Sequence, residues 1–444
     1  MELGKIRKIY FVGIGGIGMS AVAGIAKAQG FEVEGSDATD VYEPSKGVLD
    51  KYAVPYHIGY SASNFDGADL VVTTSAVDQT NPELAKALEN NIPVASFAEL
   101  LAELVKDKKQ VLVVGTHGKG TTAGLIAYAM LQENNCFFVG GVLTDLNTNF
   151  AYGKGPYMVI EGDEYKTNFD NNKPKFSYFN PDILLINNIE YDHPDMYPDL
   201  SAYKKAFQNL AESLPETSKI VYNADDANVV EVIQNAKAQK IEFSMSNLGS
   251  NLSALISQGK LPGKLYAYDY LAAVTVLKTL GYTEEWILPV LQKYSGIKRR
   301  YEIISQGNYT VIDDYAHHPT AVKATLDATK EKYAGRRVVA FFEPHTYSRT
   351  KETLSDLAQA FGSADLVYLA EVYPAREQKL PSSITGREVA AAIAVNNPNV
   401  RYVVNREEAL REYSKETKPG DVIVVMAVGS FNTLAYDLKG KYGK

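Results

Sequence analysis

A glycine-rich loop in the first third of the chain carries the residue types of a phosphate site. The loop consists of Gly115, Thr116, His117, Gly118, Lys119, Gly120, Thr121 and Thr122. Glycines let backbone N–H groups approach phosphate oxygens, and the ammonium group of Lys119 can reach a β- or γ-phosphate. A threonine hydroxyl group at the end of the loop could hold Mg²⁺. The loop therefore predicts a site for a nucleotide and its metal ion.

The match to the full P-loop pattern is only partial. Val113 stands where the pattern has glycine, and Gly120 stands where it has serine or threonine directly after the lysine. A Gly-Lys-Gly turn can also be an ordinary connection between a strand and a helix. Taken by itself, the loop leaves a nucleotide site and a plain turn equally open.

A second glycine-rich turn lies close to the N-terminus. Its glycines are Gly13, Gly15, Gly16 and Gly18. They follow an expected strand at residues 8–12, and Ser36 and Asp37 stand about 20 residues further on, where dinucleotide folds place an acid for a ribose hydroxyl group. The turn predicts a site for a nucleotide-linked ligand. The alternative is a glycine turn needed only for close packing.

Carboxylates gather after two further expected strands. They are Glu161, Asp163 and Glu164 at the C-terminal end of the strand that begins at residue 157, and Glu190, Asp192 and Asp195 around His193 after residues 183–189. Ligands of an open α/β sheet bind at the carboxyl ends of its strands, and Mg²⁺ prefers carboxylate and phosphate oxygens. The first cluster therefore predicts part of a magnesium site. His193 is a candidate cation ligand or general base, although a hydrogen-bonded surface histidine is the simpler interpretation of this residue alone.

Short apolar strands alternate with helices to hold these side chains. In the last third of the chain we expect strands at 310–312, 337–342, 366–369 and 422–426. Asp314, Tyr315 and His317 follow the first of them, and His345 and Arg349 follow the second. Such alternation is typical of a parallel sheet flanked by helices.

The length of 444 residues indicates about three domains. We expect them at residues 1–107, 108–297 and 298–444, with a basic stretch that includes Arg300 at the second boundary. Residues 239–263 are rich in serine, asparagine and glycine and predict an irregular connection. Helical patterns follow at 267–280 and 284–294.

The composition excludes several classes of function. The net charge of -8 provides no basic surface for nucleic acid or an anionic membrane. A single cysteine, Cys136, excludes a disulfide framework and fits a reducing compartment. The N-terminus lacks the apolar core of a signal peptide, and no segment has the length of a transmembrane helix. We expect a cytoplasmic protein with small-molecule partners.

Seven motifs resemble, in order, those of the Mur ligases of peptidoglycan synthesis. They are Gly13-Ile-Gly-Gly-Ile-Gly-Met-Ser-Ala21, Gly115-Thr-His-Gly-Lys119, Glu161-Gly-Asp-Glu164, Asn188-Ile-Glu-Tyr-Asp-His193, Arg299-Arg-Tyr-Glu302, Asp313-Asp-Tyr-Ala-His-His-Pro319 and Pro344-His-Thr-Tyr-Ser-Arg-Thr350. The resemblance covers nearly the whole chain. Seven ordered motifs are far more specific than any one of them.

The resemblance implies a three-domain α/β architecture. It has a Rossmann-like N-terminal domain for the UDP-sugar, a central P-loop ATPase-like parallel sheet, and a C-terminal Rossmann-like domain that binds the amino acid and closes. It also implies an ATP-dependent, ADP-forming amide ligase that uses Mg²⁺. Within the family the chain is most similar to the branch that adds L-alanine to UDP-N-acetylmuramate, as a monomer or weak homodimer.

The resemblance also implies roles for individual residues. The catalytic ones would be Lys119, Glu161, His193, His317 and Arg349. The ATP-binding ones would be residues 115–122 of the loop together with Arg300 and Asp314. The substrate-binding ones would be Gly13, Gly15, Gly16, Gly18, Ser36, Asp37, Tyr315, His345, Arg349 and Arg376. The Mg²⁺ ligands would be Thr121, Glu161 and His193.

Several departures from the family pattern leave alternatives open. Gly120 replaces a threonine, Leu265 and Asp269 stand in the motif that contacts adenine, and residues 426–430 differ from the usual glycine-rich ending. A relative that binds the UDP-sugar but has impaired ATP chemistry is therefore one alternative. The length of the segment 161–193 resembles the branch that recycles a murein tripeptide, which is a second. A nucleotide-dependent dehydrogenase would explain the first glycine turn alone.

Overall fold

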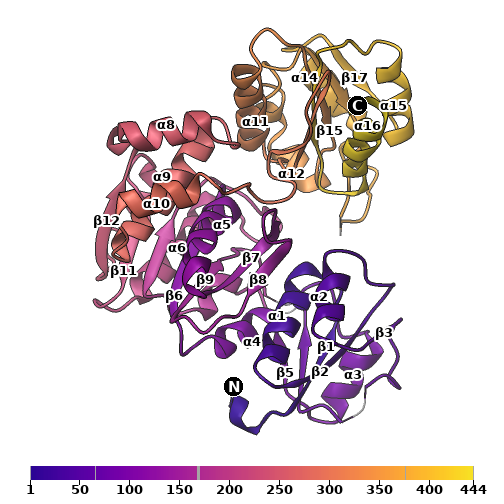
Figure 1. The fold of residues 1–444 in the computed structure, drawn as a ribbon. Coiled ribbons are helices and arrows are strands. Elements are labelled where there is room, and N and C mark those ends of the chain that lie inside the picture. The colour runs from indigo at the N-terminus through magenta and orange to yellow at the C-terminus, as the bar shows by residue number, and fades with distance from the viewer. Residues whose placement is uncertain (1, 66, 168–170, 376, 444) are drawn as a thin grey trace. The chain divides into compact units, whose positions relative to one another are not determined.

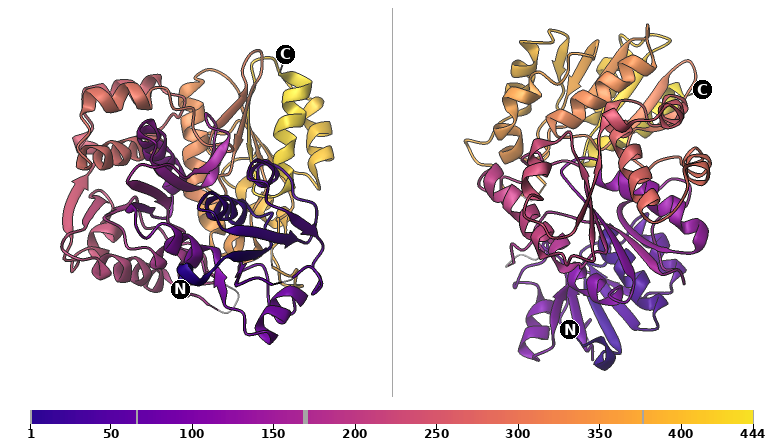
Figure 2. Two further views of the ribbon diagram at one scale, coloured as in Figure 1. Left: turned by 60° about the horizontal axis from the view of Figure 1, so that its bottom comes forward. Right: turned by 90° about the vertical axis from the view of Figure 1, so that its left-hand side faces the viewer.

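Three sheets, each built mainly from parallel strands, form the framework of the protein. The structure is a computed structural model, and it describes residues 2–65, 67–167, 171–375 and 377–443 (Figures 1 and 2). Contacts divide the chain into two units. The first unit is Met1–Tyr191, Pro198–Leu248 and Leu271–Tyr294, and the second is Asp192–Tyr197, Gly249–Tyr270 and Ser295–Lys444.

The N-terminal sheet of the first unit has the strand order β3-β2-β1-β4-β5 with all strands parallel. Its elements are β1 Lys8–Val12, α1 Ile17–Ala28, β2 Glu32–Asp37, α2 Ser45–Lys51, β3 Tyr56–Ile58, β4 Leu70–Thr73, α3 Pro82–Glu89, β5 Val94–Ser96 and α4 Phe97–Leu104. A Cβ on Gly35 would lie 2.5 Å from the carbonyl oxygen of Phe11, so β2 needs glycine where it passes β1. The expected strand at 8–12 is confirmed.

The central sheet of the first unit has the order β12-β11-β10-β6-β9-β7-β8. The elements of this part are β6 Lys109–Val114, α5 Lys119–Met130, β7 Cys136–Leu143, β8 Thr148–Ala151, β9 Tyr157–Glu161, β10 Ile183–Ile186, α6 Leu200–Ser213, β11 Lys219–Asn223, α7 Ala227–Val232, β12 Gln239–Phe243 and α10 Glu284–Leu291. Helix α9 spans Lys264–Thr279, and its residues from Leu271 onward belong to the first unit. Strands β6, β9 and β10 run parallel side by side. Their carboxyl ends therefore bring the glycine loop and both acidic segments to one edge of the sheet.

The prediction of an irregular connection at residues 239–263 was wrong. Strand β12 pairs with β11 in parallel, and helix α8 spans Ser250–Gln258 in the second unit. Only Phe243 of β12 is fully buried, because the strand lies at the sheet edge, so it lacks the apolar run of a central strand. Similarly, α8 has few buried residues, and its serine-rich sequence resembles a loop.

The sheet of the second unit has the order β13-β14-β18-β15-β16-β17. Its elements are β13 Glu302–Ser305, β14 Thr310–Asp314, α11 Pro319–Lys332, β15 Val338–Phe342, α12 Tyr347–Glu352, α13 Leu354–Leu357, β16 Leu366–Leu369, α14 Gly386–Ala394, β17 Val400–Tyr402, α15 Arg406–Ser414, β18 Val422–Met426 and α16 Leu434–Tyr442. Helix α11 lies on one face and α16 on the other (Figure 1). Every residue of β14, β15 and β18 is buried, as expected for parallel strands covered on both faces.

No helix in the part of the chain that the structure describes could span a membrane. None of the helices combines the length and the apolar character that a membrane-spanning helix requires.

A buried carboxylate ties the N-terminal sheet to the loop that follows β3. The side chain of Glu83 is fully buried at the start of α3. It accepts hydrogen bonds from the hydroxyl groups of Ser36 and Tyr10, from the backbone N–H of Ser61 at 3.1 Å and from Nδ2 of Asn64 at 2.9 Å. Four donors therefore depend on one side chain.

The substitution Glu83→Ala is expected to lower the free energy of unfolding by about 2–4 kcal/mol, because it leaves buried donors without an acceptor. Urea denaturation measures this change. Glu89 lies in the same helix but is exposed. Glu89→Ala should therefore change stability by less than about 0.5 kcal/mol. Equal losses for the two variants would contradict the role assigned to Glu83.

Candidate active site

The glycine-rich loop forms a tight turn between β6 and α5. Gly115 has a φ of 137° and Gly118 a φ of 77°, both in the left-handed region that favours glycine. A Cβ on Gly115 would lie 2.9 Å from the carbonyl oxygen of Asn188. The turn is therefore closed to bulkier residues at position 115. It leads directly into the N-terminus of α5, and such helix termini bind phosphate groups.

The side chain of Lys119 folds back over this turn. Its Nζ donates to the carbonyl oxygens of Gly115 at 2.6 Å and Thr116 at 3.1 Å, and to Oε1 of Glu164 at 3.1 Å. Burial lowers the pKa of Lys119, but the carboxylates of Glu164 and Glu161 outweigh burial and raise the pKa above its ordinary value. A positive charge is thus fixed at the mouth of the loop.

The carboxylate of Glu161 lies against the first turn of α5. Its Oε2 accepts a hydrogen bond of 2.6 Å from the backbone N–H of Gly140. A Cβ on Gly120 would lie 3.2 Å from the same oxygen, which is closer than side chains normally pack. Glycine at position 120 therefore makes room for Glu161, and this gives the departure from the family pattern a physical reason.

The two threonines that end the loop have different surroundings. Thr122 is fully buried, and its Oγ1 accepts a hydrogen bond of 2.9 Å from Nδ2 of Asn187. Thr121 is also buried and lies beside Thr122 in the first turn of α5. The hydroxyl group of Thr122 thus has a structural role in the core, which leaves Thr121 as the candidate for the metal.

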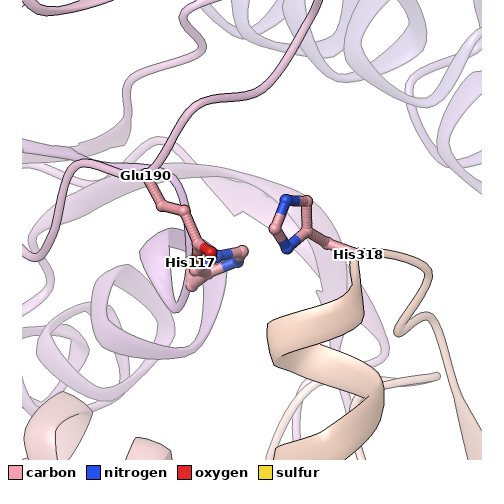
Figure 3. A group of neighbouring side chains, drawn as sticks. All are labelled: His117, Glu190 and His318. Carbon is pink, nitrogen blue, oxygen red and sulfur yellow. Dashed lines mark hydrogen bonds and ion pairs between the residues drawn. The ribbon is translucent and has the colours of Figure 1, made fainter. Parts of the chain in front are cut away.

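Residues after β10 brace the loop from the other side. The ring of His117 lies beside Glu190, with 2.6 Å between Nε2 and Oε2 (Figure 3). The backbone N–H of His117 donates to Oδ1 of Asn188 at 2.8 Å, and Oγ1 of Thr116 donates to the carbonyl oxygen of Glu190 at 2.7 Å. The predicted ATP-binding residues Thr116 and His117 are therefore held by the second acidic segment.

The first glycine turn closes around Asp37. The backbone N–H of Gly15 donates to Oδ2 of Asp37 at 2.8 Å, and Gly16 is the N-cap of α1. A Cβ on Gly18 would lie 3.4 Å from the ring of Phe97, an ordinary van der Waals contact, so packing alone does not require glycine there. The hydroxyl group of Ser36 instead donates to the buried Glu83. Asp37 is thus in contact with the turn, while the side chain of Ser36 makes a buried hydrogen bond to Glu83 instead.

Arg349 is the centre of a buried cluster in the second unit. Its Nε and Nη2 each lie 2.8 Å from Oδ1 of Asp192, and its Nη1 lies 2.6 Å from Nδ1 of His345. The side chains of Arg349 and Asp192 are 8% and 9% exposed. Burial raises the pKa of Asp192, but the charges of His193 and Arg349 outweigh burial and hold the pKa below its ordinary value. The carboxylate is therefore ionised.

Two histidines of this cluster are held in the neutral form. Burial and the charge of Arg349 lower the pKa of His345 to about 4 and hold the pKa of His317 well below its ordinary value. The rings of the two residues meet edge to face with 5.2 Å between their centroids. Nδ1 of His317 lies 2.8 Å from the carbonyl oxygen of Tyr315, which indicates that Nδ1 carries the proton and Nε2 is an acceptor.

The predicted nucleotide residues of the second unit lie near Tyr315. The guanidinium group of Arg300 lies over the Tyr315 ring at 4.9 Å. Asp314 is buried at the end of β14, where it accepts hydrogen bonds from Thr325 at 2.8 Å and from the backbone N–H of Ala316 at 3.0 Å. Burial raises the pKa of Asp314.

The predicted metal ligands fall in different units. Thr121 and Glu161 belong to the first unit, and His193 belongs to the second. The backbone N–H of His193 donates to Oδ1 of Asp192 at 2.7 Å, and its φ of 58° marks a sharp turn. The metal assignment of these residues stays a prediction. Arg376, the last predicted substrate residue, lies outside the described residues.

Two site residues have contacts that the sequence motifs did not specify. Asp192 stands next to His193 in an acidic cluster, but no local pattern pairs it with Arg349, 157 positions away. Glu377 accepts hydrogen bonds from the backbone N–H groups of Tyr347 at 2.6 Å and Ser348 at 3.1 Å, and so orients the start of α12. Pairing over such separations leaves no periodic signal in one sequence.

Three family profiles match the chain in order. The profile of the Mur ligase family catalytic domain matches residues 8–109, that of the Mur ligase middle domain matches 113–264, and that of the Mur ligase glutamate ligase domain matches 299–429. Together the three profiles cover most of the sequence.

Relatives and solved structures match over nearly the full length. The UDP-N-acetylmuramate–L-alanine ligase of Clostridium tetani is 36% identical over 448 residues, covering 96% of each chain. The same enzyme of Persephonella marina is 33% identical, covering 98% of this chain and 97% of the relative. The crystal structure of UDP-N-acetylmuramate-alanine ligase from Thermotoga maritima has a TM-score of 0.79 at 26% identity, covering 98% and 99%. A murein peptide ligase from Psychrobacter arcticus has a TM-score of 0.71 at 25% identity, covering 99% of each chain.

Two acids of the second unit are buried beside Arg299. Neither carboxylate oxygen of Asp313 has a hydrogen-bond partner among the described residues, and Nε of Arg299 lies 3.6 Å away. Burial raises the pKa of Asp313 to about 7. Burial also raises the pKa of Glu343 to about 7, although the backbone N–H of Gly429 donates to it at 2.8 Å. Both acids are therefore protonated in the folded protein under mildly acidic conditions.

Stability is expected to fall as the pH rises from about 4 to about 7, because over this range the unfolded acids release protons that the folded ones retain. Asp313→Asn keeps the neutral form at every pH. The midpoint of thermal unfolding should therefore drop less for this variant than for the wild type across that range. Asp437 is a half-exposed control, and Asp437→Asn should leave the wild-type slope unchanged. An unchanged slope in Asp313→Asn would refute the assignment.

Proposed function

This chain belongs to the Mur ligase family, and we propose that it is an ADP-forming ligase that joins the carboxyl group of UDP-N-acetylmuramate to the amino group of L-alanine. The observation that carries this proposal is the identity of 33–36% to L-alanine ligases over at least 95% of the chain. In addition, the glycine-rich loop holds the charged Lys119 at the N-terminus of α5.

The reaction requires two transfers. The muramate carboxylate attacks the γ-phosphate of ATP and forms an acyl phosphate with release of ADP. The amino group of L-alanine then attacks the acyl carbon, and phosphate leaves. The loop at 115–122 and Lys119 would hold the transferred phosphate, because a fixed positive charge and backbone N–H groups stabilise the charge that spreads over its oxygens.

Mg²⁺ fits part of the residue set present. The hydroxyl group of Thr121 and the carboxylate of Glu161 are oxygen donors of the kind that Mg²⁺ prefers, and His193 offers a nitrogen that it prefers less. When bound, the ion would neutralise phosphate charge. Glu161 is also held in place by Gly140, so its carboxylate needs little reorganisation.

The second unit would receive the amino acid. Arg349 offers N–H donors for its carboxylate, and the neutral His317 offers an acceptor nitrogen for its amino group. Tyr315 and His345 complete this set, while Arg300 and Asp314 would contact the nucleotide. The first glycine turn and Asp37 would bind the UDP portion of the other substrate.

The remaining predictions extend this proposal. We propose that the three domains meet near residues 107 and 297, that the protein is cytoplasmic, and that it is a monomer or weak homodimer. A ligase that recycles a murein tripeptide on the same UDP-sugar is the second candidate. It is supported by the similarity to the murein peptide ligase structure.

Phosphate release in the presence of ATP, Mg²⁺ and UDP-N-acetylmuramate tests the function. We expect release that depends on L-alanine, and little release with the L-alanyl-γ-D-glutamyl-diaminopimelate tripeptide. Mass spectrometry should detect the alanyl product. Turnover with the tripeptide alone would assign the recycling reaction, and no turnover with either acceptor would refute both candidates.

Paired threonine variants test the metal assignment. Thr121→Ala should lower kcat roughly 10- to 100-fold, because it removes an oxygen ligand, and raise the Mg²⁺ concentration needed for half activity. Thr122→Ala should lower stability by about 1–2 kcal/mol through the lost hydrogen bond to Asn187 while keeping most turnover. If only Thr122→Ala abolished turnover, Thr121 would not be the ligand.

A further inference from the structure

The guanidinium group of Arg349 is bound along one edge only. It has five N–H groups. Oδ1 of Asp192 accepts a hydrogen bond from Nε at 2.8 Å and forms an ion pair with Nη2 at the same distance, and Nδ1 of His345 accepts an N–H of Nη1 at 2.6 Å. Among the described residues two N–H groups donate hydrogen bonds, and at least one N–H on each terminal nitrogen is left without a partner.

The two remaining donors suit one kind of ligand. A guanidinium group is planar and its two terminal nitrogens present parallel N–H groups, a spacing that matches the two oxygens of a carboxylate. The side chain of Arg349 is buried, so packing against its neighbours sets its position. The group that binds the Nε side of the guanidinium then determines how its two terminal nitrogens are oriented toward a ligand.

We propose that Asp192 is a positioning residue that clamps the Nε edge of Arg349 and so presents the terminal edge to the carboxylate of the amino-acid substrate. This inference rests on the proposed function, since it takes L-alanine as the ligand. Asp192 does not touch the substrate in this arrangement. It acts through Arg349.

The clamp itself is fixed by its surroundings within the second unit. The backbone N–H of His193 donates to Oδ1 of Asp192 at 2.7 Å, on the same oxygen that binds Arg349. His345 is held on its other side by Tyr373, whose ring stacks on it with 6.0 Å between centroids. Arg349 is thus restrained at three of its nitrogen atoms by groups that are themselves restrained.

Preorganisation of this kind should appear in substrate affinity. A long arginine side chain that must be ordered on binding loses conformational entropy, whereas a clamped one has already been ordered on folding. Loss of the clamp should therefore weaken binding of the amino acid and leave the two nucleotide substrates unaffected. A purely structural role would instead lower stability without this selectivity.

Asp192→Asn tests the clamp with minimal change of shape. The amide oxygen can still accept one hydrogen bond, but the charge and the tight two-donor contact are lost. We expect the KM for L-alanine to rise at least roughly tenfold, with the KM for ATP and for UDP-N-acetylmuramate within about twofold of wild type. Arg349→Lys should raise the same KM, and the double variant should show far less than the product of the two effects.

Asp421 supplies the matched control. It is a buried carboxylate in the same unit and accepts from Nε of Arg337 at 2.8 Å and from Nη2 at 2.6 Å. It lies just before β18, whereas the cluster around Arg349 follows the carboxyl end of β15. Asp421→Asn should lower the unfolding midpoint but leave the KM for L-alanine unchanged.

A measurement without turnover separates the two proposals. In ¹⁵N-arginine NMR spectra, the Nε–H of Arg349 should exchange slowly with water in the wild type and quickly in Asp192→Asn. An unchanged KM for L-alanine, an equal rise in all three KM values, or fast Nε–H exchange in the wild type would overturn the clamp. Failure of the wild type to turn over any acceptor, with slow exchange intact, would refute the proposed function and with it the substrate named here.

Discussion

The buried ion pair between Lys119 and Glu164 is the interaction on which the glycine-rich loop at residues 115–122 depends. Nζ lies 3.0 Å from Oε2, and the two side chains are 13% and 3% exposed. Removing both charges from water costs several kcal/mol per ion unless further hydrogen bonds compensate. The carbonyl oxygens of Gly115 and Thr116 supply that compensation. The turn, the start of α5 and the segment after β9 are therefore stabilised as one assembly, and changes in one part should be felt in the others.

The sequence predicted the parts of this assembly that follow from local chemistry. Strands β6, β9 and β10 are short and largely aliphatic because central parallel strands are buried on both faces, and the glycine turn or a group of carboxylates lies at or shortly after the end of each strand. Their parallel pairing then brings the loop and the acids to one edge. The edge strand β12 and helix α8 were missed for the opposite reason, since their exposed faces carry no apolar run.

Side-chain pairing within the site could not be predicted in the same way. The sequence gives no reason to assign different roles to the neighbouring residues Thr121 and Thr122. The structure distinguishes them, because Thr122 accepts a hydrogen bond from Asn187. Likewise, the sequence alone marks Gly120 only as a departure from the motif, whereas the structure shows the carboxylate of Glu161 packed against it. Such distinctions depend on residues brought together by the sheet, and periodicity carries no information about them.

The charge balance of the Arg349 cluster has a consequence for its ligand. Arg349 and Asp192 form the ion pair at its centre, and His317 and His345 beside them are neutral because burial and Arg349 lower their pKa values. His193 also acts on the carboxylate of Asp192 and lowers its pKa. Burying a net charge is costly, whereas a zwitterion adds none. Under the proposed function, the guanidinium group would face the carboxylate of the amino acid and the imidazole acceptor its amino group, so both charged ends of the zwitterion would have a partner. If His345 were cationic, its Nδ1 could not accept from Nη1, and one of the contacts that orient Arg349 would be lost.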